Sequence, residues 1–333
     1  MSTKREIKEP SYFRSIIKGF FKNKLGVVSL IIIILISLIA LFAPLIANDK
    51  PLLICHNKKF YFPAFRFEPE LKNYYSIEDY KSKKFDLIIY PIIPISPTQY
   101  NLKERLQPPS KKHIFGTDDR GRDVFVRMIY GARISLTVGF VAESISIVLG
   151  LFFGILAGYY GGKVDLYISR FIEIIMCFPT FFLILAVLAI WEPSIYNIMF
   201  VIGITGWTGI ARLVRGEFLR VKALDFITGA KVSGASAFRI ILLHILPNAL
   251  APVFVAATFG IASAILVESS LSFLGFGVPP PTPTWGDILS QGRNYTEFAY
   301  WLIVFPGSAI FIVVTCYNII GEVLRDLINP KNE

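Results

Sequence analysis

The sequence predicts an all-α membrane protein with six transmembrane helices and a large polar external insert after the first span. Of the 333 residues, 54% are hydrophobic and the mean hydropathy is positive, so the chain is more apolar than a soluble domain. Six apolar runs are each long enough to cross a bilayer as a helix, which takes about 20 residues. An even number of spans also keeps the basic N-terminal segment and the basic loop after the fourth span on one side of the membrane.

Residues 1–25 form a basic N-terminal segment that we expect in the cytoplasm. Seven Lys and Arg residues stand there against two Glu residues, and the positive-inside rule places such a segment on the cytoplasmic side. The first transmembrane helix is expected over 26–48, and no cleavable signal peptide is expected because no small-residue cleavage site follows this long apolar run. Residues 49–134 then form the polar insert, where aromatic and charged residues alternate over 58–70 and predict short strands.

Five further helices are expected in a core that covers residues 135–326, before a cytoplasmic tail at 327–333. Their predicted ranges are 136–157, 171–190, 195–213, 249–276 and 300–321. In the second span, Gly150 and Gly154 have the spacing that lets two helices approach closely. In the third span, Pro179 interrupts the helix, because proline has no N–H to donate.

The polar stretch between the fourth and fifth spans, 222–248, predicts two short helices joined by an elbow. Asp225 and Ser236 are candidate N-caps, because their side chains can accept hydrogen bonds from the first amides of a helix. Gly234 is expected to end the first helix in a left-handed conformation. Pro247 is expected to break the second helix before the fifth span begins. An ordinary amphipathic loop lying on the lipid surface is the alternative interpretation.

Several segments of the chain resemble one family. They are GTDDRGRDV at 116–124, YGARISL at 130–136, YYGGKVD at 159–165 and LSFLGFGVPPPTPTWG at 271–286, together with the small residues around Gly234 and the ILP at 245–247. In this order they are similar to ABC importer permeases of the dipeptide and oligopeptide C-subunit class. The stretch LIANDKPLL at 45–53 is similar to the Yej-type branch. The resemblance implies the ABC type I importer permease fold.

The same resemblance implies that the loop at 222–248 couples the permease to an ATPase by docking in a cleft on that subunit. The positions that match the family's loop are Asp225, Thr228, Gly229, Ala230, Gly234, Arg239, Leu246 and Pro247. The chain departs from the pattern at two of them. Thr228 stands where the family usually has Glu, and Gly229 stands where its first Ala stands. A charge-assisted contact from that glutamate is therefore not available here.

The partners implied by the resemblance are a second, B-type permease subunit, two ATPase subunits, an external peptide-binding protein, a peptide substrate and membrane lipid. The implied location is the bacterial inner membrane, with several spans and both termini in the cytoplasm. No cofactor is expected on this chain, since ATP-Mg would bind the partner subunits. The external insert is either a passive cap or a lip that touches the binding protein.

Three acidic residues lie within or at the edges of the predicted spans: Glu143, Glu173 and Glu268. An acid that faces lipid at mid-span costs roughly 2.5–3.5 kcal/mol on insertion scales, so each must face the bundle interior, water or a partner subunit. Two interpretations stay open. The acids hydrogen-bond neighbouring helices, or they line a translocation path and meet the amino terminus or a cationic side chain of a peptide.

Catalysis, metal binding and nucleic-acid binding are not expected of this chain. The sequence has no Walker motif and no nucleophile–base set, and Cys55, Cys177 and Cys316 lack the spacing of metal ligands. Its basic residues flank the predicted spans, where anionic headgroups are the expected counter-charge. Two other classes remain as alternatives: an ion-coupled secondary transporter, which should show inverted repeats with broken helices, and a membrane anchor.

Overall fold

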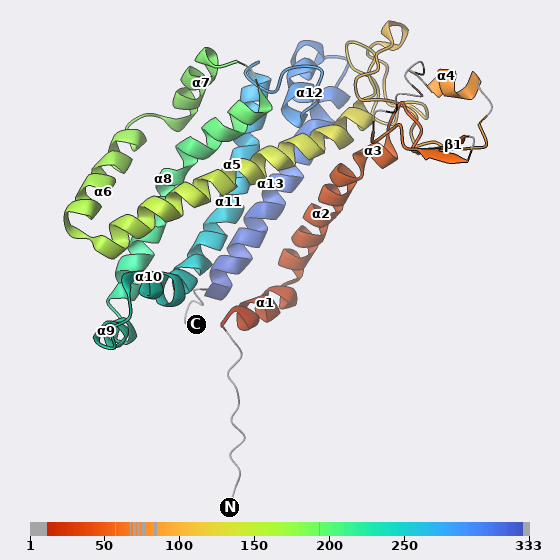
Figure 1. The fold of residues 1–333 in the computed structure, drawn as a ribbon. Coiled ribbons are helices and arrows are strands. Elements are labelled where there is room, and N and C mark those ends of the chain that lie inside the picture. Colours follow the sequence, from red (N-terminus) through yellow and green to blue (C-terminus); the bar gives the residue numbers. More distant parts are fainter. Residues whose placement is uncertain are drawn as a thin grey trace, which may run out of the picture.

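The computed structural model is a bundle of long helices with a small strand-containing unit at one end (Figure 1). It describes residues 12–328, apart from 57, 67, 69–70, 72–73, 75–76, 83–84 and 193. Residues 1–11 of the expected cytoplasmic segment and residues 329–333 of the expected tail therefore lie outside the described residues. N- and C-terminal helices meet at the end of the bundle opposite the strands.

The α-helices are α1 (Tyr12–Lys22), α2 (Lys24–Leu41), α3 (Ala43–Ile46), α4 (Ile77–Ser82), α5 (Val124–Tyr160), α6 (Gly162–Met176), α7 (Thr180–Ile190), α8 (Ile195–Lys222), α9 (Asp225–Val232), α10 (Ala237–Arg239), α11 (Leu246–Phe273), α12 (Trp285–Gly292) and α13 (Trp301–Ile328). The strands are β1 (Leu53–His56), β2 (Lys59–Tyr61) and β3 (Leu87–Ile89). Short 3-10 helices are η2 (Leu102–Glu104) and η4 (Arg293–Tyr295), and η3 (Ile240–Ile245) is a π-helix.

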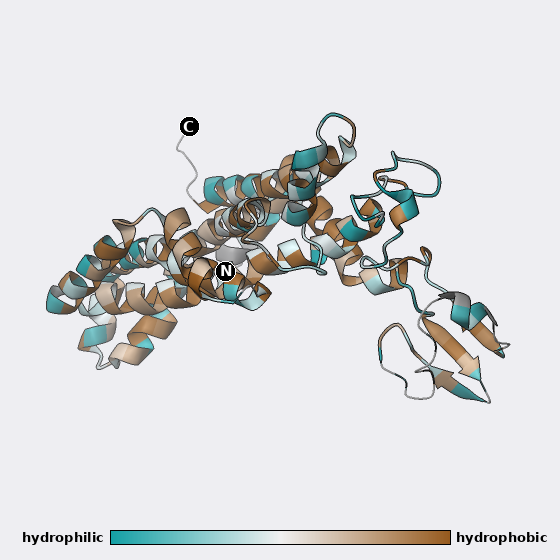
Figure 2. Ribbon diagram, turned by 90° about the horizontal axis from the view of Figure 1, so that it is seen from above, coloured by the Kyte–Doolittle hydropathy of each residue, from teal (hydrophilic) through white to brown (hydrophobic). Residues whose placement is uncertain are grey.

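The prediction of six spans agrees with the helices. Five are long and apolar enough to cross a membrane, and there are up to six if the pair α6 and α7 counts as one span bent by 78°. The bend falls at Pro179, which caps α7 and prevents the ladder of helical hydrogen bonds from continuing. Figure 2 shows hydrophobic residues along the lengths of the helices. On α2, Ile31, Leu35 and Leu38 are exposed, as expected of a surface that contacts lipid.

The second long helix begins earlier than predicted, at Val124 rather than at 136, so the insert ends ten residues or so before the expected boundary at 134. Asp123 starts this helix, because its side chain accepts a hydrogen bond from the backbone N–H of Val126 at 2.9 Å. The segment that contains Arg127 and Arg133 was expected to belong to the insert at 49–134. It is nevertheless the first part of α5.

The centre of the bundle is the contact of α5 with α8, which depends on glycine. A Cβ added at Gly150 would lie 2.6 Å from Cβ of Ile210, and one added at Gly154 would lie 2.6 Å from Cβ of Val214. Any larger residue would push the two helices apart. The predicted close approach at these two glycines is confirmed.

The polar insert contains a three-stranded antiparallel sheet in the order β2-β1-β3. Ile54, Tyr61 and Ile88 turn one face of the sheet toward Tyr80 of α4, with which they form a small apolar core. The prediction of short strands is therefore confirmed: β2 lies within the expected region at 58–70, whereas β1 precedes it and β3 follows it.

Candidate functional site

The predicted loop at 222–248 is a helical hairpin that projects from one end of the bundle. It consists of α9 and α10 and lies at the same end as α1, opposite the strands (Figure 1). α9 follows α8 after a short turn, and α10 leads through η3 into α11. The hairpin therefore joins the fourth and fifth spans directly.

The elbow of this hairpin is Gly234, as predicted. It has φ +81°, a left-handed conformation that side-chain-bearing residues rarely adopt. Its N–H donates to the carbonyl of Lys231 at 3.0 Å, and the N–H of Ala235 donates to the carbonyl of Ala230 at 3.1 Å. These two bonds form the Schellman motif that ends an α-helix. The angle between α9 and the following helix is thus fixed by backbone geometry.

Two of the three other local predictions are wrong. Ser236 caps α10, because its Oγ accepts a hydrogen bond from the N–H of Arg239, as expected. Asp225 is not the N-cap of α9. Leu224 holds that position without a side-chain hydrogen bond, and Asp225 is the first helical residue. Pro247 does not break the second helix either: the π-turn of η3 precedes it, and the helix from Ala237 to Phe273 is long and apolar as one unit.

The hairpin is anchored by three buried isoleucines. Ile227 of α9 is fully buried, as are Ile240 and Ile245 of η3, and all three pack in one cluster with Phe218 and Val221 of α8. A displacement of α9 must therefore move α8 and the start of α11 with it, since close-packed side chains transmit strain.

The outer side of the hairpin is apolar and bare. Phe226 is 49% exposed, Phe238 is 72% exposed, and Val232 is 85% exposed. We call these three residues the exposed apolar triad. The space around Gly229 and Gly234 is open, with no heavy atom of a described residue within 4 Å of a Cβ built there.

The other residues predicted for this loop divide between its tip and its base. Thr228, Gly229 and Arg239 are exposed, and Ala230 is half-buried beside them. Leu246 and Pro247 lie at the base, where η3 meets α11. Six of the eight predicted residues thus lie on the projecting hairpin, with open space around Gly229 and Gly234.

The three intramembrane acids have three different surroundings. Glu268 of α11 is fully buried, and its carboxylate accepts hydrogen bonds from the hydroxyls of Ser135 (3.2 Å), Ser269 (3.4 Å) and Ser272 (2.8 Å). Ser135 in turn accepts from the N–H of Trp285 at 3.4 Å. Glu268 therefore holds the start of α12 against α5 and α11.

Glu173 of α6 lies on the surface and pairs with Arg170 at 2.6 Å. Glu143 of α5 is 7% exposed, and within the described part of the chain its Oε1 has no hydrogen-bond partner. Of the three acids, only Glu143 combines burial with an unsatisfied oxygen.

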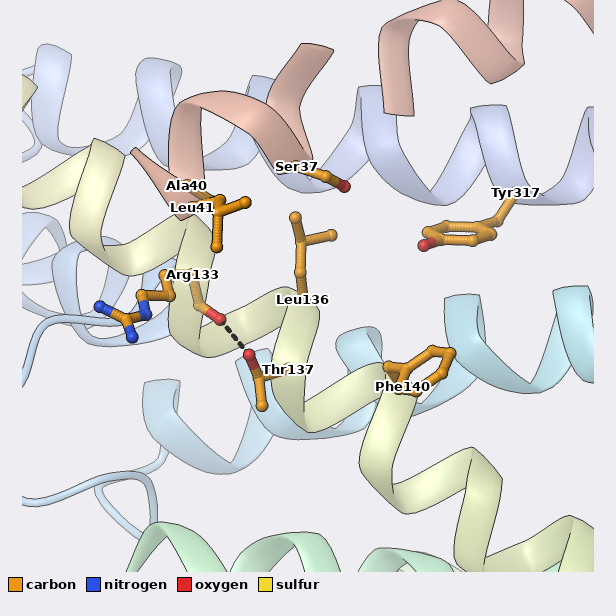
Figure 3. Close-up of a pocket in the computed structure, with 8 residues that line it drawn as sticks. All are labelled: Ser37, Ala40, Leu41, Arg133, Leu136, Thr137, Phe140 and Tyr317. Atoms are coloured by element: carbon orange, nitrogen blue, oxygen red, sulfur yellow. Dashed lines mark hydrogen bonds between the residues drawn. The ribbon is translucent and has the colours of Figure 1, made fainter. Parts of the chain in front are cut away.

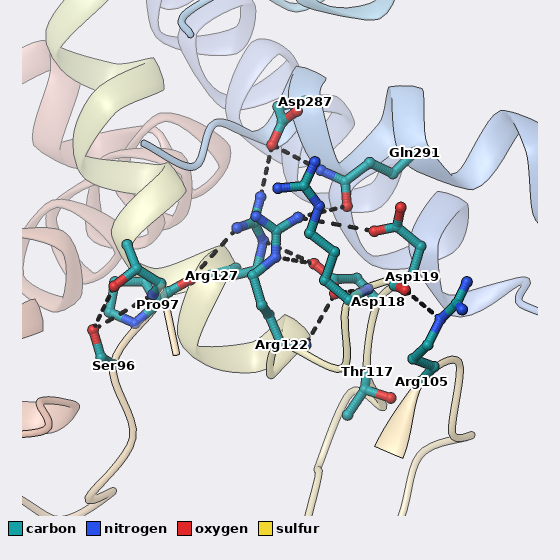
Figure 4. A network of polar contacts seen from close by, with 12 residues as sticks. Ser96, Pro97, Arg105, Thr117, Asp118, Asp119, Arg122, Arg127, Asp287 and Gln291 are labelled. Carbon is teal, nitrogen blue, oxygen red and sulfur yellow. Dashed lines mark hydrogen bonds and ion pairs between the residues drawn. The ribbon is translucent and has the colours of Figure 1, made fainter. Parts of the chain in front are cut away.

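Sequence reasoning missed a buried charge network at the external end of α5 (Figure 4). Asp123 accepts a hydrogen bond from the N–H of Val126 and lies 2.8 Å from Nδ1 of His113. Arg127, 1% exposed, donates to Asp287 of α12 at 2.6 Å and lies 3.5 Å from Asp118, an ion-pair distance without hydrogen-bond geometry.

Asp118, fully buried, also accepts from Nε of Arg122 at 2.6 Å. The GTD and GRD motifs are therefore structural: they tie the insert to α5 and α12. The charged residues of these motifs are evident in the sequence, but no local pattern indicated that Asp287 would pair with Arg127.

A cavity of about 310 Å³ lies between α2, α5 and α13 (Figure 3). Leu41, Leu136 and Phe140 line it, and the guanidinium of Arg133 points away from the other lining residues. The hydroxyl of Thr137 donates a hydrogen bond to the carbonyl of Arg133 at 2.6 Å. The lining offers packing surface and no charged group directed inward.

Two families match the chain. "Binding-protein-dependent transport system inner membrane component" covers residues 150–333, and "N-terminal TM domain of oligopeptide transport permease C" covers residues 11–62. A dipeptide transport system permease protein, DppC, of Alkalihalophilus pseudofirmus is 39% identical over 96% of this chain and 90% of its own length. An oligopeptide transport system permease protein, OppC, of Bacillus subtilis is 32% identical over 97% of this chain and 91% of its own length.

Among solved structures, a chain of the MetNI methionine ABC transporter, described as inward facing, has a TM-score of 0.50 and 20% identity. It aligns with 61% of this chain and 97% of that one. This similarity shows the type I importer permease fold. The resemblance to dipeptide and oligopeptide permeases is confirmed by the matches, and the Yej-type branch stays a prediction. The chain belongs to the family of binding-protein-dependent transport system inner membrane components and is a multi-pass permease of the inner membrane.

Proposed function

We propose that this permease forms, with a second permease subunit, the translocation path of an ATP-driven importer of peptides. The substrate class is supported by the relatives, which are named as dipeptide and oligopeptide transport permeases and align over nearly the whole chain. The second permease, two ATPase subunits and an external peptide-binding protein are the partners that such a system requires.

The observation that carries the proposal is the projecting hairpin. Its inner side is packed against α8 and α11 through buried isoleucines, and its outer side exposes the apolar triad to solvent. Exposing apolar side chains to water costs about 25 cal/mol per Å², so the exposed apolar triad favours a protein partner. The family's coupling loop docks on an ATPase, and this hairpin has small residues at the same positions, Gly229 and Ala230, followed by the same glycine elbow. Thr228 replaces the usual glutamate, so docking here depends on apolar contact more than on charge.

Movement of the docked hairpin is the proposed link between ATP and transport. When the ATPase subunits close on ATP-Mg, α9 moves with them, and buried Ile227 carries the motion to α8 and α11. These two helices then alter the opening of the path. Only differential docking in the two states of the ATPases can drive such a change. No cofactor or catalysis is assigned to this chain, because ATP is hydrolysed by the partners.

The proposed orientation puts the hairpin and both termini in the cytoplasm. The strand-containing insert lies at the other end of the bundle (Figure 1), so it faces outward and is available to the peptide-binding protein. An ion-coupled transporter is not proposed again, because the family and the fold are those of binding-protein-dependent permeases.

The test is ATP-driven uptake of a labelled peptide by the complete transporter in proteoliposomes. Val232→Asp in the exposed apolar triad should abolish most of the uptake and weaken co-purification of the ATPases, because a charge would be buried in the docked interface. Tyr100→Asp is the matched control for co-purification of the ATPases, since Tyr100 is 69% exposed in the external insert. Normal uptake and co-purification with Val232→Asp would contradict the proposal.

A further inference from the structure

A cavity inside the bundle, lined by one carboxylate, several hydroxyls and apolar side chains, supports an inference about the substrate. It has a volume of about 150 Å³ and lies where α5, α7, α8 and α11 meet. Glu143 of α5 lines it, and Thr180, at the bend between α6 and α7, lines it from an exposed position. We call this space the Glu143 cavity. It therefore connects a buried carboxylate with the outside of the bundle at the point where the third span is broken.

The carboxylate of Glu143 lacks the partners that a buried acid needs. It is 7% exposed, and its Oε1 is buried without a hydrogen bond from any described residue. Glu268, on the neighbouring α11, is by contrast a buried carboxylate that accepts hydrogen bonds from serine hydroxyls of this chain. An ionised buried acid without a partner is strongly unfavourable. When it is ionised, Glu143 therefore needs a hydrogen-bond donor from outside the described residues.

Of the four hydroxyl-bearing residues that line the Glu143 cavity, Ser146 and Thr205 donate away from it. The Oγ of Ser146 donates to the carbonyl of Gly203 at 2.8 Å, and the Oγ1 of Thr205 donates to the carbonyl of Val201 at 2.9 Å. Each hydroxyl has one proton, so these two oxygens keep only acceptor positions for the cavity. A carboxylate and two acceptor hydroxyls call for a ligand that donates hydrogen bonds and carries positive charge.

Gly260 of α11 keeps the carboxylate in place. A Cβ at this position would lie 2.1 Å from the carboxyl carbon of Glu143. No side chain fits there, and only glycine lets the acid rest against the α11 backbone. Alanine at this position would have to push the carboxylate out of its present place.

The shape of the lining distinguishes an ammonium group from a metal ion. Ile184, Ile202 and Val267 form an apolar part of the wall, which suits a carbon-bound cation and offers no ligand to a bare ion. In the described residues no group of three or more His, Cys, Asp or Glu could hold a metal. A primary ammonium has three N–H donors and no acceptor, which matches one carboxylate and two acceptor hydroxyls.

We propose that the Glu143 cavity binds a primary ammonium group, and that its natural ligand is the amino terminus of the transported peptide. The second clause rests on the proposed function. This chain then takes part in selecting its substrate, by pairing Glu143 with a free amino terminus as the peptide passes the bend between α6 and α7. This contact does not discriminate between peptides by their length or side chains.

Infrared difference spectroscopy of the complete transporter in lipid vesicles tests the chemistry without requiring transport. Ethylammonium chloride should perturb a carboxyl band that is lost in Glu143→Gln and weakened in Gly260→Ala. Tetramethylammonium, which has no N–H, and sodium should leave the band unchanged. Glu173→Gln is the matched control, because Glu173 is exposed and already paired, and it should retain the full response.

The same carboxyl band, isolated by subtracting the spectrum of Glu143→Gln from that of the parent chain, tests whether a peptide amino terminus supplies the ammonium. Trialanine should reproduce the ethylammonium response, and N-acetyl-trialanine should not. An absent band, an equal response to sodium or tetramethylammonium, or a band that survives in Glu143→Gln overturns the site. A response to ethylammonium with none to trialanine overturns the assignment to a peptide. A complex that gives the trialanine response but imports no peptide contradicts the proposed function and not this site.

Discussion

Arg127 in the first turn of α5 donates to Asp287 in α12 at 2.6 Å, although the two residues are 160 positions apart. This pair joins the external end of the second span to the helix that precedes the sixth. Asp118 lies on the other side of the same guanidinium at 3.5 Å. One buried cation thus holds two acids from different parts of the chain.

Arg127→Met should lower the free energy of unfolding by about 3–5 kcal/mol, because it leaves buried Asp118 without one of its cations. Thermal unfolding of the purified chain in detergent measures the change. Arg133→Met is the control, since Arg133 is exposed on the same helix, and it should change stability little. Equal melting of the two variants would show that the pair contributes nothing.

Glu268→Ala should destabilise the chain by about 1–3 kcal/mol or more, because three serine hydroxyls lose their acceptor. Glu268→Gln should cost less, since its amide oxygen still accepts. Neither change should alter which peptides are taken up if Glu268 is structural. A shift in peptide preference at normal stability would instead place Glu268 on the path.

Gly234→Val should leave membrane insertion intact and reduce coupling of ATP hydrolysis to uptake. The left-handed backbone at φ +81° costs a side-chain-bearing residue about 1–2 kcal/mol, so the elbow would relax. Gly216→Ala is the matched control, because Gly216 lies in α8 outside the hairpin, with no heavy atom of a described residue within 4 Å of an added Cβ. Uptake per ATP hydrolysed is the quantity to compare, and an unchanged ratio in Gly234→Val would contradict a docked elbow.

Glu104 in the external insert makes the insert sensitive to acid. A hydrogen bond from Lys112 lowers the pKa of the Glu104 carboxyl, against a smaller opposing effect of burial. Because the folded-state pKa is the lower one, ionised Glu104 stabilises the insert above its ordinary pKa of about 4.3, and this contribution disappears as pH falls through the folded value.

The melting difference between the parent chain and Glu104→Gln should therefore shrink between roughly pH 5 and pH 3. Lys103→Gln serves as the control, because Lys103 neighbours Glu104 without forming this contact. A constant difference across that range would exclude a titrating Glu104.

The spans were predictable because each is an apolar run, and so was the elbow, because Gly234 adopts a conformation that favours glycine. The start of α5 was not, since the buried partners of Arg127 come from distant positions and make its charge tolerable in a helix. Asp225 failed as a cap for a local reason: the turn from α8 ends at Leu224, and helix α9 begins one residue earlier than the cap requires. The unsatisfied carboxylate oxygen of Glu143 was not predictable either. It lies where four helices meet, and no local sequence pattern indicates that meeting point.

Photo-crosslinking from Val232 tests the central claim most directly. A benzophenone maleimide would be attached to Val232→Cys, in a chain whose Cys55, Cys177 and Cys316 are replaced, within membranes that contain the whole transporter. The account predicts capture of an ATPase subunit, with a yield that changes on adding ATP, and none from the same label on Tyr100→Cys. Failure to capture an ATPase from Val232, with the chain inserted and the ATPases present, would contradict the assignment of this hairpin as the coupling element.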